Sequence, residues 1–446
     1  MNKKLFPILS AFLLLFSLIE KGQATETYRP ETSVAGFIQL PGSGRQVYNF
    51  NPGWRFFKGD IHGAESVDFD DRSWTIVSTP HTVELMPAEA SGCRNYQGPA
   101  WYRKHFVLPA ETKGKRVLIH FEAAMGKQVL YLNGKRIQEH VGGYLPFTLD
   151  LTTNGIQAGD SCLLAIFVDN SNDKSFPPGK PQYTLDFAYH GGIYRDVWMI
   201  AKSPVSITDP LDSQTVAGGG VFVHFDKISE KSAQVYVNTE LQNDNQHTET
   251  VTVETTLTDA DGKVIKRTSG KLSLKSGEKK IIRQQVEVKS PKLWSPDAPY
   301  LYRVQSCIKK GNQSIDGGIT RIGIRLAEFR GKDGFWLNGK PFGQLVGANR
   351  HQDFAYVGNA LPNSQQWRDA KRLRDAGCTI IRVAHYPQDP SFMDACDELG
   401  MFVIVATPGW QYWNKDVKFG ELVHQNTREM IRRDRNHPSV LGTYSE

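Results

Sequence analysis

The sequence predicts a multidomain protein of the β plus α/β class, with two β-sandwich domains followed by a parallel α/β domain. From about residue 45 to 327, short segments of alternating apolar and polar residues are separated by turn residues, which predicts strands. After residue 328, strand patterns alternate with helix patterns on a period of about 30 residues, which is typical of a parallel sheet. The length of 446 residues is sufficient for several domains.

The first sandwich is predicted within residues 25–203. Arg116–Phe121 and Gln128–Leu132 alternate in polarity, and Cys162–Val168 is a continuous apolar run. Gln128–Leu132 leads into Asn133-Gly134, the strongest short signal for a hairpin, because both turn positions need a positive φ. Many short strands at this spacing predict a jelly roll or a related all-β sandwich.

The second sandwich is predicted over residues 204–327. Strand patterns recur here at the spacing of an immunoglobulin-like domain, and Asp261-Gly262 supplies a hairpin turn. The predicted strands include Gln234–Gln242, Val251–Leu257, Lys279–Val288 and Leu301–Lys309.

The third region, residues 328–446, has the strand and helix order of a barrel or of a doubly wound sheet. The strands are predicted at Phe342–Ala348, Thr379–Ala384, Met401–Ala406 and Ser439–Tyr444. The helices are predicted at Ser364–Ala376, from Ser391 onward with Ser391 and Asp394 as a capping pair, and at about 420–435.

Two observations favour the barrel over the doubly wound sheet. No glycine-rich phosphate loop follows the first strand. Polar residues instead cluster just after the strand ends, at 349–351, 385–386 and 410–413, and barrel enzymes build their active sites at that end of the strands.

Residues 1–24 have the features of a signal peptide. Lys3 and Lys4 precede an apolar run from Leu5 to Ile19, and small residues follow. We expect an exported protein, periplasmic or secreted, with no membrane association after cleavage; an uncleaved anchor is the alternative. The 53 Lys and Arg residues are nearly balanced by 47 Asp and Glu residues and form no basic block, so no nucleic-acid partner is expected. The five cysteines are interpreted as mostly buried small hydrophobes.

A set of short motifs resembles glycoside hydrolase family 2, the family of β-galactosidases, β-glucuronidases and β-mannosidases. Each motif is weak alone, but their order and spacing together are highly specific. They are Gly98-Pro99-Ala100-Trp101-Tyr102-Arg103, Gly142-Gly143-Tyr144, Gly191-Gly192-Ile193-Tyr194-Arg195-Asp196-Val197, Phe335-Trp336-Leu337-Asn338-Gly339-Lys340, Gly347-Ala348-Asn349-Arg350-His351, Ile381-Arg382-Val383-Ala384-His385-Tyr386-Pro387 and Arg433-Asp434-Arg435-Asn436-His437-Pro438-Ser439-Val440.

The resemblance implies a sugar-binding jelly roll, an immunoglobulin-like domain and a catalytic (β/α)8 barrel that hydrolyses β-glycosidic bonds with retention. The expected partners are oligo- or polysaccharide β-glycosides, with β-galactoside the first choice and β-glucuronide or β-mannoside as alternatives. A non-catalytic carbohydrate-binding protein is the alternative from another class.

No catalytic residue is assigned. Retention needs two carboxyl groups about 5 to 5.5 Å apart. Counting along the family pattern from His437 places the acid/base Glu beyond Glu446, and the nucleophile belongs near the seventh strand. Glu446 lacks the preceding Asn of the family pattern. We therefore expect residues 328–446 to form the first half of the barrel and the chain as printed to be inactive. Because half a barrel leaves sheet edges unpaired, a second copy of the chain is a candidate partner.

Five residues are candidates for substrate binding, from their match to the family or, for Trp410, from its aromatic side chain. His351 and His385 match histidines that contact the sugar, and Arg382 would hold the nucleophile's carboxylate ionised. Asp186 falls where galactose-specific members carry an Asp that reaches from the jelly roll into the sugar site, with a loop-stabilising role as the alternative. Trp410 would stack on a sugar face or belong to the core. Arg195 is expected at a domain interface.

No cofactor and no metal site are predicted. The metal-dependent β-galactosidases carry a Glu and a His where this chain has Trp410 and Tyr412. Neither aromatic ring supplies the oxygen ligands that a hard cation requires.

Overall fold

The computed structural model describes residues 30–86, 95–213, 215–409 and 411–444. From Thr32 onward the chain forms one compact unit. The predicted signal peptide at 1–24, as well as Cys93, Trp410 and Glu446, lie outside the described residues. No helix in the described ranges has both the length and the apolar character needed to cross a membrane.

The first domain is a two-sheet sandwich, which confirms the predicted jelly roll. One sheet has six strands in the order β3-β2-β4-β9-β6-β7, and the other has four in the order β1-β10-β5-β8. The strands are β1 (Gln46–Asn49), β2 (Trp54–Lys58), β3 (Thr75–Val77), β4 (Pro99–Val107), β5 (Arg116–Phe121), β6 (Gly126–Leu132), β7 (Lys135–Gly142), β8 (Phe147–Asp150), β9 (Ser161–Asp169) and β10 (Val197–Lys202).

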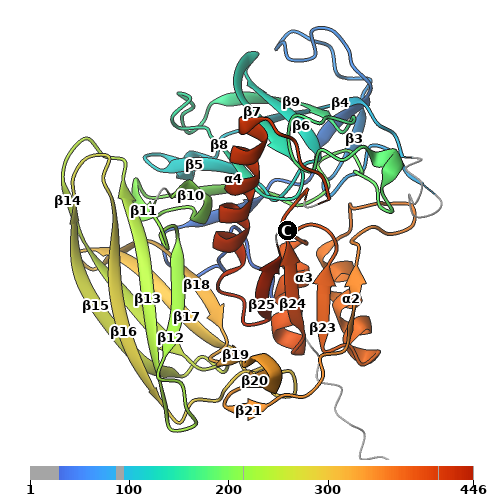
Figure 1. Cartoon of the computed structure of the whole chain (residues 1–446). Helices are drawn as coiled ribbons and strands as arrows, with labels where there is room; N and C mark the ends of the chain where they lie inside the picture. Colours follow the sequence, from blue (N-terminus) through green and yellow to red (C-terminus); the bar gives the residue numbers. More distant parts are fainter. Residues whose placement is uncertain (1–29, 87–94, 214, 410, 445–446) are drawn as a thin grey trace, which may run out of the picture. The chain divides into compact units, whose positions relative to one another are not determined.

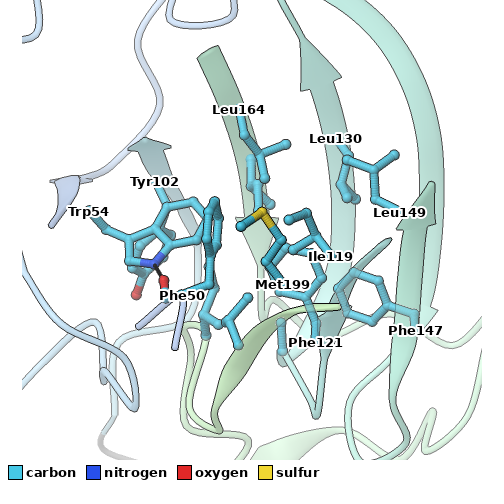
Figure 2. Close-up of a cluster of buried hydrophobic side chains, with 14 of the residues drawn as sticks. Phe50, Trp54, Tyr102, Ile119, Phe121, Leu130, Phe147, Leu149, Leu164 and Met199 are labelled. Carbon is cyan, nitrogen blue, oxygen red and sulfur yellow. Dashed lines mark hydrogen bonds between the residues drawn. The ribbon is translucent and has the colours of Figure 1, made fainter. Parts of the chain in front are cut away.

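The core of this sandwich is built from side chains of both sheets (Figure 2). Trp54 of β2 and Tyr102 of β4 face Phe121 of β5 and Met199 of β10, and all four are buried. The alternation that predicted strands places these residues inward. The β6–β7 turn has φ 50° at Asn133 and 80° at Gly134, as the hairpin prediction requires.

The second domain is also a two-sheet sandwich and confirms the immunoglobulin-like prediction. In one sheet β13 pairs with β11, β12 and β16, and the other sheet has the order β15-β14-β17-β18. Its strands are β11 (Val205–Ile207), β12 (Val221–Asp226), β13 (Ser232–Asn243), β14 (Glu249–Thr258), β15 (Val264–Leu274), β16 (Lys279–Lys289), β17 (Tyr302–Lys310) and β18 (Gln313–Ile322).

A small sheet and then four parallel strands complete the described chain. The small sheet contains β19 (Ala327–Phe329), β20 (Phe335–Leu337) and β21 (Lys340–Pro341). The parallel sheet has the order β22-β23-β24-β25, with strands β22 (Gly347–Arg350), β23 (Ile380–Val383), β24 (Phe402–Ala406) and β25 (Val440–Tyr444). The connecting helices are α2 (Asn363–Asp375), α3 (Pro390–Leu399) and α4 (Val417–Asp434) (Figure 1).

The helices cover one face of the parallel sheet, which distinguishes a barrel from a doubly wound sheet. Ile381, Val383, Val403 and Val405 alternate along β23 and β24 and pack in one cluster with buried residues of the three helices, which are Ala370, Phe392, Met393, Ala395, Cys396 and Met430. Neighbours of the opposite parity, such as Arg382 and Ile404, are only half buried. Sequential strand order with all helices on one side is the arrangement of the (β/α)8 barrel, of which these are four strands.

Two local predictions in this region were wrong. Residues 342–346 are not a strand, and β22 covers only Gly347–Arg350. The N-cap of α3 is Asp389 rather than Ser391, and the Asp389 carboxylate accepts a hydrogen bond from the Ser391 amide at 2.9 Å. Pro390 is favoured as the first helical residue, because its fixed φ suits that position and the N–H group that proline lacks would have no partner within the helix. The N-cap is therefore the residue before Pro390, which is Asp389.

Candidate functional site

The carboxyl ends of β22 and β23 bring polar side chains from separate motifs together. Asn349 and Arg382 are register partners on the two strands, and Arg382 donates to Asn349 Oδ1 at 3.5 Å. His351 and His385 follow just beyond the two strand ends. Their ring centroids lie 5.4 Å apart in an edge-to-face arrangement.

The jelly roll also contributes residues to this group. Asp186 belongs to the long connection between β9 and β10, and its carboxylate and the ring nitrogens of His351 and His385 all lie within 4.8 Å of one another. The next residue, Phe187, has its ring 5.4 Å from that of His351 and 5.6 Å from that of His385. Residues from two domains thus converge on one place.

The environment keeps His385 neutral near pH 7. Burial lowers the pKa of His385 to about 4; Arg382, His351 and Lys180 add to the lowering, and Asp186 opposes it. Arg382 donates to His385 Nδ1 at 3.2 Å, which makes that nitrogen the acceptor and leaves Nε2 as the N–H donor of the neutral ring. A neutral imidazole in this tautomer can donate a hydrogen bond to a hydroxyl oxygen.

A pocket adjoins His385 on the jelly-roll side. It is lined by Tyr144, Pro178, Lys180, Phe187, Tyr189, His385, Tyr386, Gly409 and Gln411. The rings of Tyr144 and Tyr386 stack at 4.1 Å with an interplanar angle of 6°, so one wall joins the jelly roll to the barrel domain. An aromatic wall with a few polar groups is typical of small-molecule sites.

Two buried arginines fix the strand ends that carry the site. Arg195 is fully buried and donates to Tyr144 O at 3.0 Å, to Gln352 Oε1 at 3.0 Å and to Pro387 O at 2.8 Å, as expected for a residue at a domain interface. Arg350 donates to Gln366 Oε1 and Asp369 Oδ2, both at 2.8 Å, and to Gln388.

The structure therefore brings together four of the five predicted substrate-binding residues, Asp186, His351, Arg382 and His385. Trp410, the fifth, falls outside the described residues. Sequence reasoning missed Phe187, Tyr144 and Lys180 as residues around the site. Phe187 follows Asp186 directly and Tyr144 belongs to a quoted motif, but Lys180 had no signal in the sequence.

Among the residues that the structure describes, two groups of side chains have the donor types of a metal site. In the Asp186, His351 and His385 group, the nearby Arg382 guanidinium disfavours a cation. In the Asp394, Asp397 and His437 group, the donors are engaged with the protein: Asp397 Oδ2 lies 2.6 Å from His437 Nδ1, and Asp394 pairs with Arg321 at 2.9 Å. We assign a metal to neither group.

The sequence of domains, with polar side chains gathered at the carboxyl ends of barrel strands, is that of a multidomain glycoside hydrolase. The chain belongs to glycoside hydrolase family 2. The family model for the sugar-binding domain matches residues 64–204, the model described as glycosyl hydrolases family 2 matches 219–325, and the TIM barrel model matches 329–442.

Relatives carry two different names. The chain is 36% identical over 404 residues to a β-galactosidase of Thermoanaerobacter pseudethanolicus, covering 89% of this chain and 51% of that protein. It is 32% identical to a β-glucuronidase of Formosa agariphila, covering 90% of this chain and 42% of that protein. The crystal structure of Bacteroides uniformis β-glucuronidase superposes with a TM-score of 0.81 at 32% identity, covering 90% and 47% of the two chains. The chain thus spans about half the length of the relatives it matches.

Proposed function

We propose that this chain supplies the sugar-binding part of a retaining β-glycosidase active site. The observation that carries the proposal is the convergence of Asp186 from the jelly roll with His351 and His385 from the barrel strands, all within 4.8 Å. A carboxylate and two imidazole groups at this spacing can hydrogen-bond the hydroxyl groups of one sugar ring. Family membership supports β-glycosides as the ligand class.

Each residue then has a separate role. Asp186 accepts hydrogen bonds from sugar hydroxyls, and His351 and His385 orient neighbouring hydroxyls. Arg382, beside His385, keeps a carboxylate at the reacting centre ionised through a charge-assisted hydrogen bond. The pocket wall of Tyr144 and Tyr386 excludes water from one side.

Hydrolysis needs groups beyond this set. A retaining reaction uses two carboxyl groups, one to protonate the leaving oxygen and one to attack the anomeric carbon. The described group contains one carboxylate, that of Asp186. We therefore propose that residues 25–446 bind a β-glycoside without hydrolysing it. From the signal-peptide features of residues 1–24, we also propose that the protein acts outside the cytoplasm.

The sugar specificity has two candidates. A β-galactoside is the first, because Asp186 stands where galactose-specific family members carry an Asp. A β-glucuronide is the second, because the relatives named above include β-glucuronidases.

Calorimetric titration of residues 25–446 with methyl β-D-galactoside and methyl β-D-glucuronide tests the proposal. We expect one of them to bind, and His351→Ala to weaken that binding about 10-fold, the effect of one hydrogen bond to a polar ligand group. His424→Ala, which removes an exposed histidine of α4, is the control and should bind normally. If neither sugar binds, the proposal is wrong. If the protein hydrolyses nitrophenyl β-glycosides, the proposal that it binds without hydrolysis is wrong.

A further inference from the structure

The loop at residues 177–180 of the jelly roll is fixed against the barrel domain. Gly179 has φ +71°, and a Cβ added there would lie 2.7 Å from Tyr412 Cδ1 and 2.9 Å from Phe419 Cε2. Glycine is therefore required at this contact, both for its backbone conformation and for the lack of space. Close packing of this kind leaves the next residue, Lys180, in a defined position.

Two hydrogen bonds fix the backbone at this loop and shortly before it. Tyr189 donates from its hydroxyl to Lys180 O at 2.9 Å, and Asn414 Nδ2 donates to Lys174 O at 2.8 Å. Both bonds use backbone oxygens, so they position the loop and leave the lysine side chains available.

Lys180 presents a cation to the pocket beside His385. Lys180 lines that pocket together with Tyr144, Tyr189 and Gln411, the residue is half buried, and its charge acts on His385 by lowering the pKa of that ring. Within the described part of the chain, its ammonium group has no hydrogen-bond or ion-pair partner. Arg382, the other cation nearby, already donates to His385 and Asn349.

An ammonium group without a partner gains most from an anion on the ligand. Neutral sugar hydroxyls offer it only ordinary hydrogen bonds, whereas a carboxylate or sulfate ester offers a charge-assisted bond of about twice the strength. The aromatic side chains around it reduce access of water and so reduce screening of the interaction.

We propose that Lys180 is a specificity-determining residue that selects β-glycosides carrying an anionic group, a uronate carboxylate or a sulfate ester, over neutral ones. The inference rests on the proposed function, because it places the anion on the sugar held by Asp186, His351 and His385. It assigns the choice of anionic over neutral sugar to a loop of the sugar-binding domain.

The test compares binding of three methyl β-glycosides, which are the D-galactoside, the D-glucuronide and the D-galactoside 6-sulfate. Wild-type residues 25–446 should bind at least one anionic glycoside more tightly than the neutral one. Lys180→Met should remove about 10- to 100-fold of that preference, the range of one hydrogen bond to a charged group, and leave the affinity for the neutral glycoside within about 2-fold. The glucuronide and sulfate arms distinguish the two sources of the anion.

Lys174→Met is the matched control, because it removes the same charge from an exposed lysine of the same connection. It should leave the preference unchanged, which separates a specific contact from general attraction. Equal preference in wild type and Lys180→Met overturns the inference while neutral-sugar binding upholds the proposed function. No binding of any of the three glycosides overturns the proposed function itself.

Discussion

The two β-sandwich domains have the same layered construction but make different contributions to the site. The jelly roll sends the long connection between β9 and β10 to the carboxyl ends of the barrel strands, where it places Lys180, Asp186 and Phe187. The immunoglobulin-like domain meets the barrel domain before its strands begin: Trp294 donates to Asp397 O at 2.9 Å, and Asn436 donates to Val221 O at 2.8 Å.

The difference follows from the direction of the strands. Chemistry in a barrel belongs to the carboxyl ends of its strands, whereas the amino ends are associated with stability. A sandwich that contacts the carboxyl ends contributes residues to the site. A sandwich that contacts the amino ends stabilises the barrel domain. Substitutions at the two contacts should therefore have different consequences.

Arg195→Met should have the largest effect of the substitutions considered. It leaves Tyr144 O, Gln352 Oε1 and Pro387 O without their donor in a fully buried place. We expect a loss of about 5 kcal/mol in the free energy of unfolding, measured by urea denaturation. Sugar affinity should also fall at temperatures where the variant stays folded, because the connection between β9 and β10 loses its hydrogen bonds to Gln352 and Pro387 of the barrel domain. Arg72→Met removes an exposed arginine and should change neither quantity.

Trp294→Ala tests the other contact. Trp294 is fully buried, and its ring packs edge to face on Phe402 at 5.4 Å. Loss of the ring and of its hydrogen bond should cost about 4 kcal/mol of unfolding free energy. Sugar affinity of the folded variant should match wild type. If Trp294→Ala weakened sugar binding as strongly as Arg195→Met does, the functional division between the sandwiches would be wrong.

A pH effect of smaller size is expected at the same support contact. Burial alone would lower the pKa of His437, but Asp397, followed by Asp394 and Asp434, raises it to about 9. A histidine whose pKa rises on folding stabilises the fold below its unfolded value of about 6.5 and loses that contribution as the pH rises through 9. The contribution is on the order of 3 kcal/mol.

Urea denaturation at a series of pH values checks this expectation. The unfolding free energy of wild type should fall more steeply between about pH 6.5 and 9.5 than that of His437→Gln, which has no imidazole to titrate. Parallel curves for the two proteins would show that the Asp397–His437 pair does not hold its proton. His424→Gln should reproduce the wild-type slope.

The sequence predicted the sandwiches and the barrel because their signals are local. Alternating polarity and the Asn133-Gly134 turn depend on neighbours in the chain, and the structure follows them closely. Two local predictions were wrong. Pro390 shifted the cap of α3 to Asp389. Residues 342–346 form no strand: Phe342 and Leu345 are partly buried against the cluster around Trp294, whereas Val346 is exposed.

The candidate site was predictable only in part, because part of it depends on contacts between distant segments. Arg382, His351 and His385 could be placed from motifs at strand ends, and Asp186 from one matching position. Lys180 lies in a loop whose path is set by Tyr412 and Phe419, more than two hundred residues further along the chain. No periodicity or motif records such a contact.

A double-mutant cycle on sugar affinity tests whether the jelly roll and the barrel domain share one site. Asp186→Asn changes the jelly roll, His385→Ala changes the barrel, and calorimetry with the tighter-binding methyl glycoside measures each single variant and the pair. We predict a coupling energy of at least about 1 kcal/mol, since both side chains would act on the same sugar. Asp186→Asn combined with His424→Ala should be additive within about 0.5 kcal/mol. Additivity of Asp186→Asn with His385→Ala would contradict a shared site.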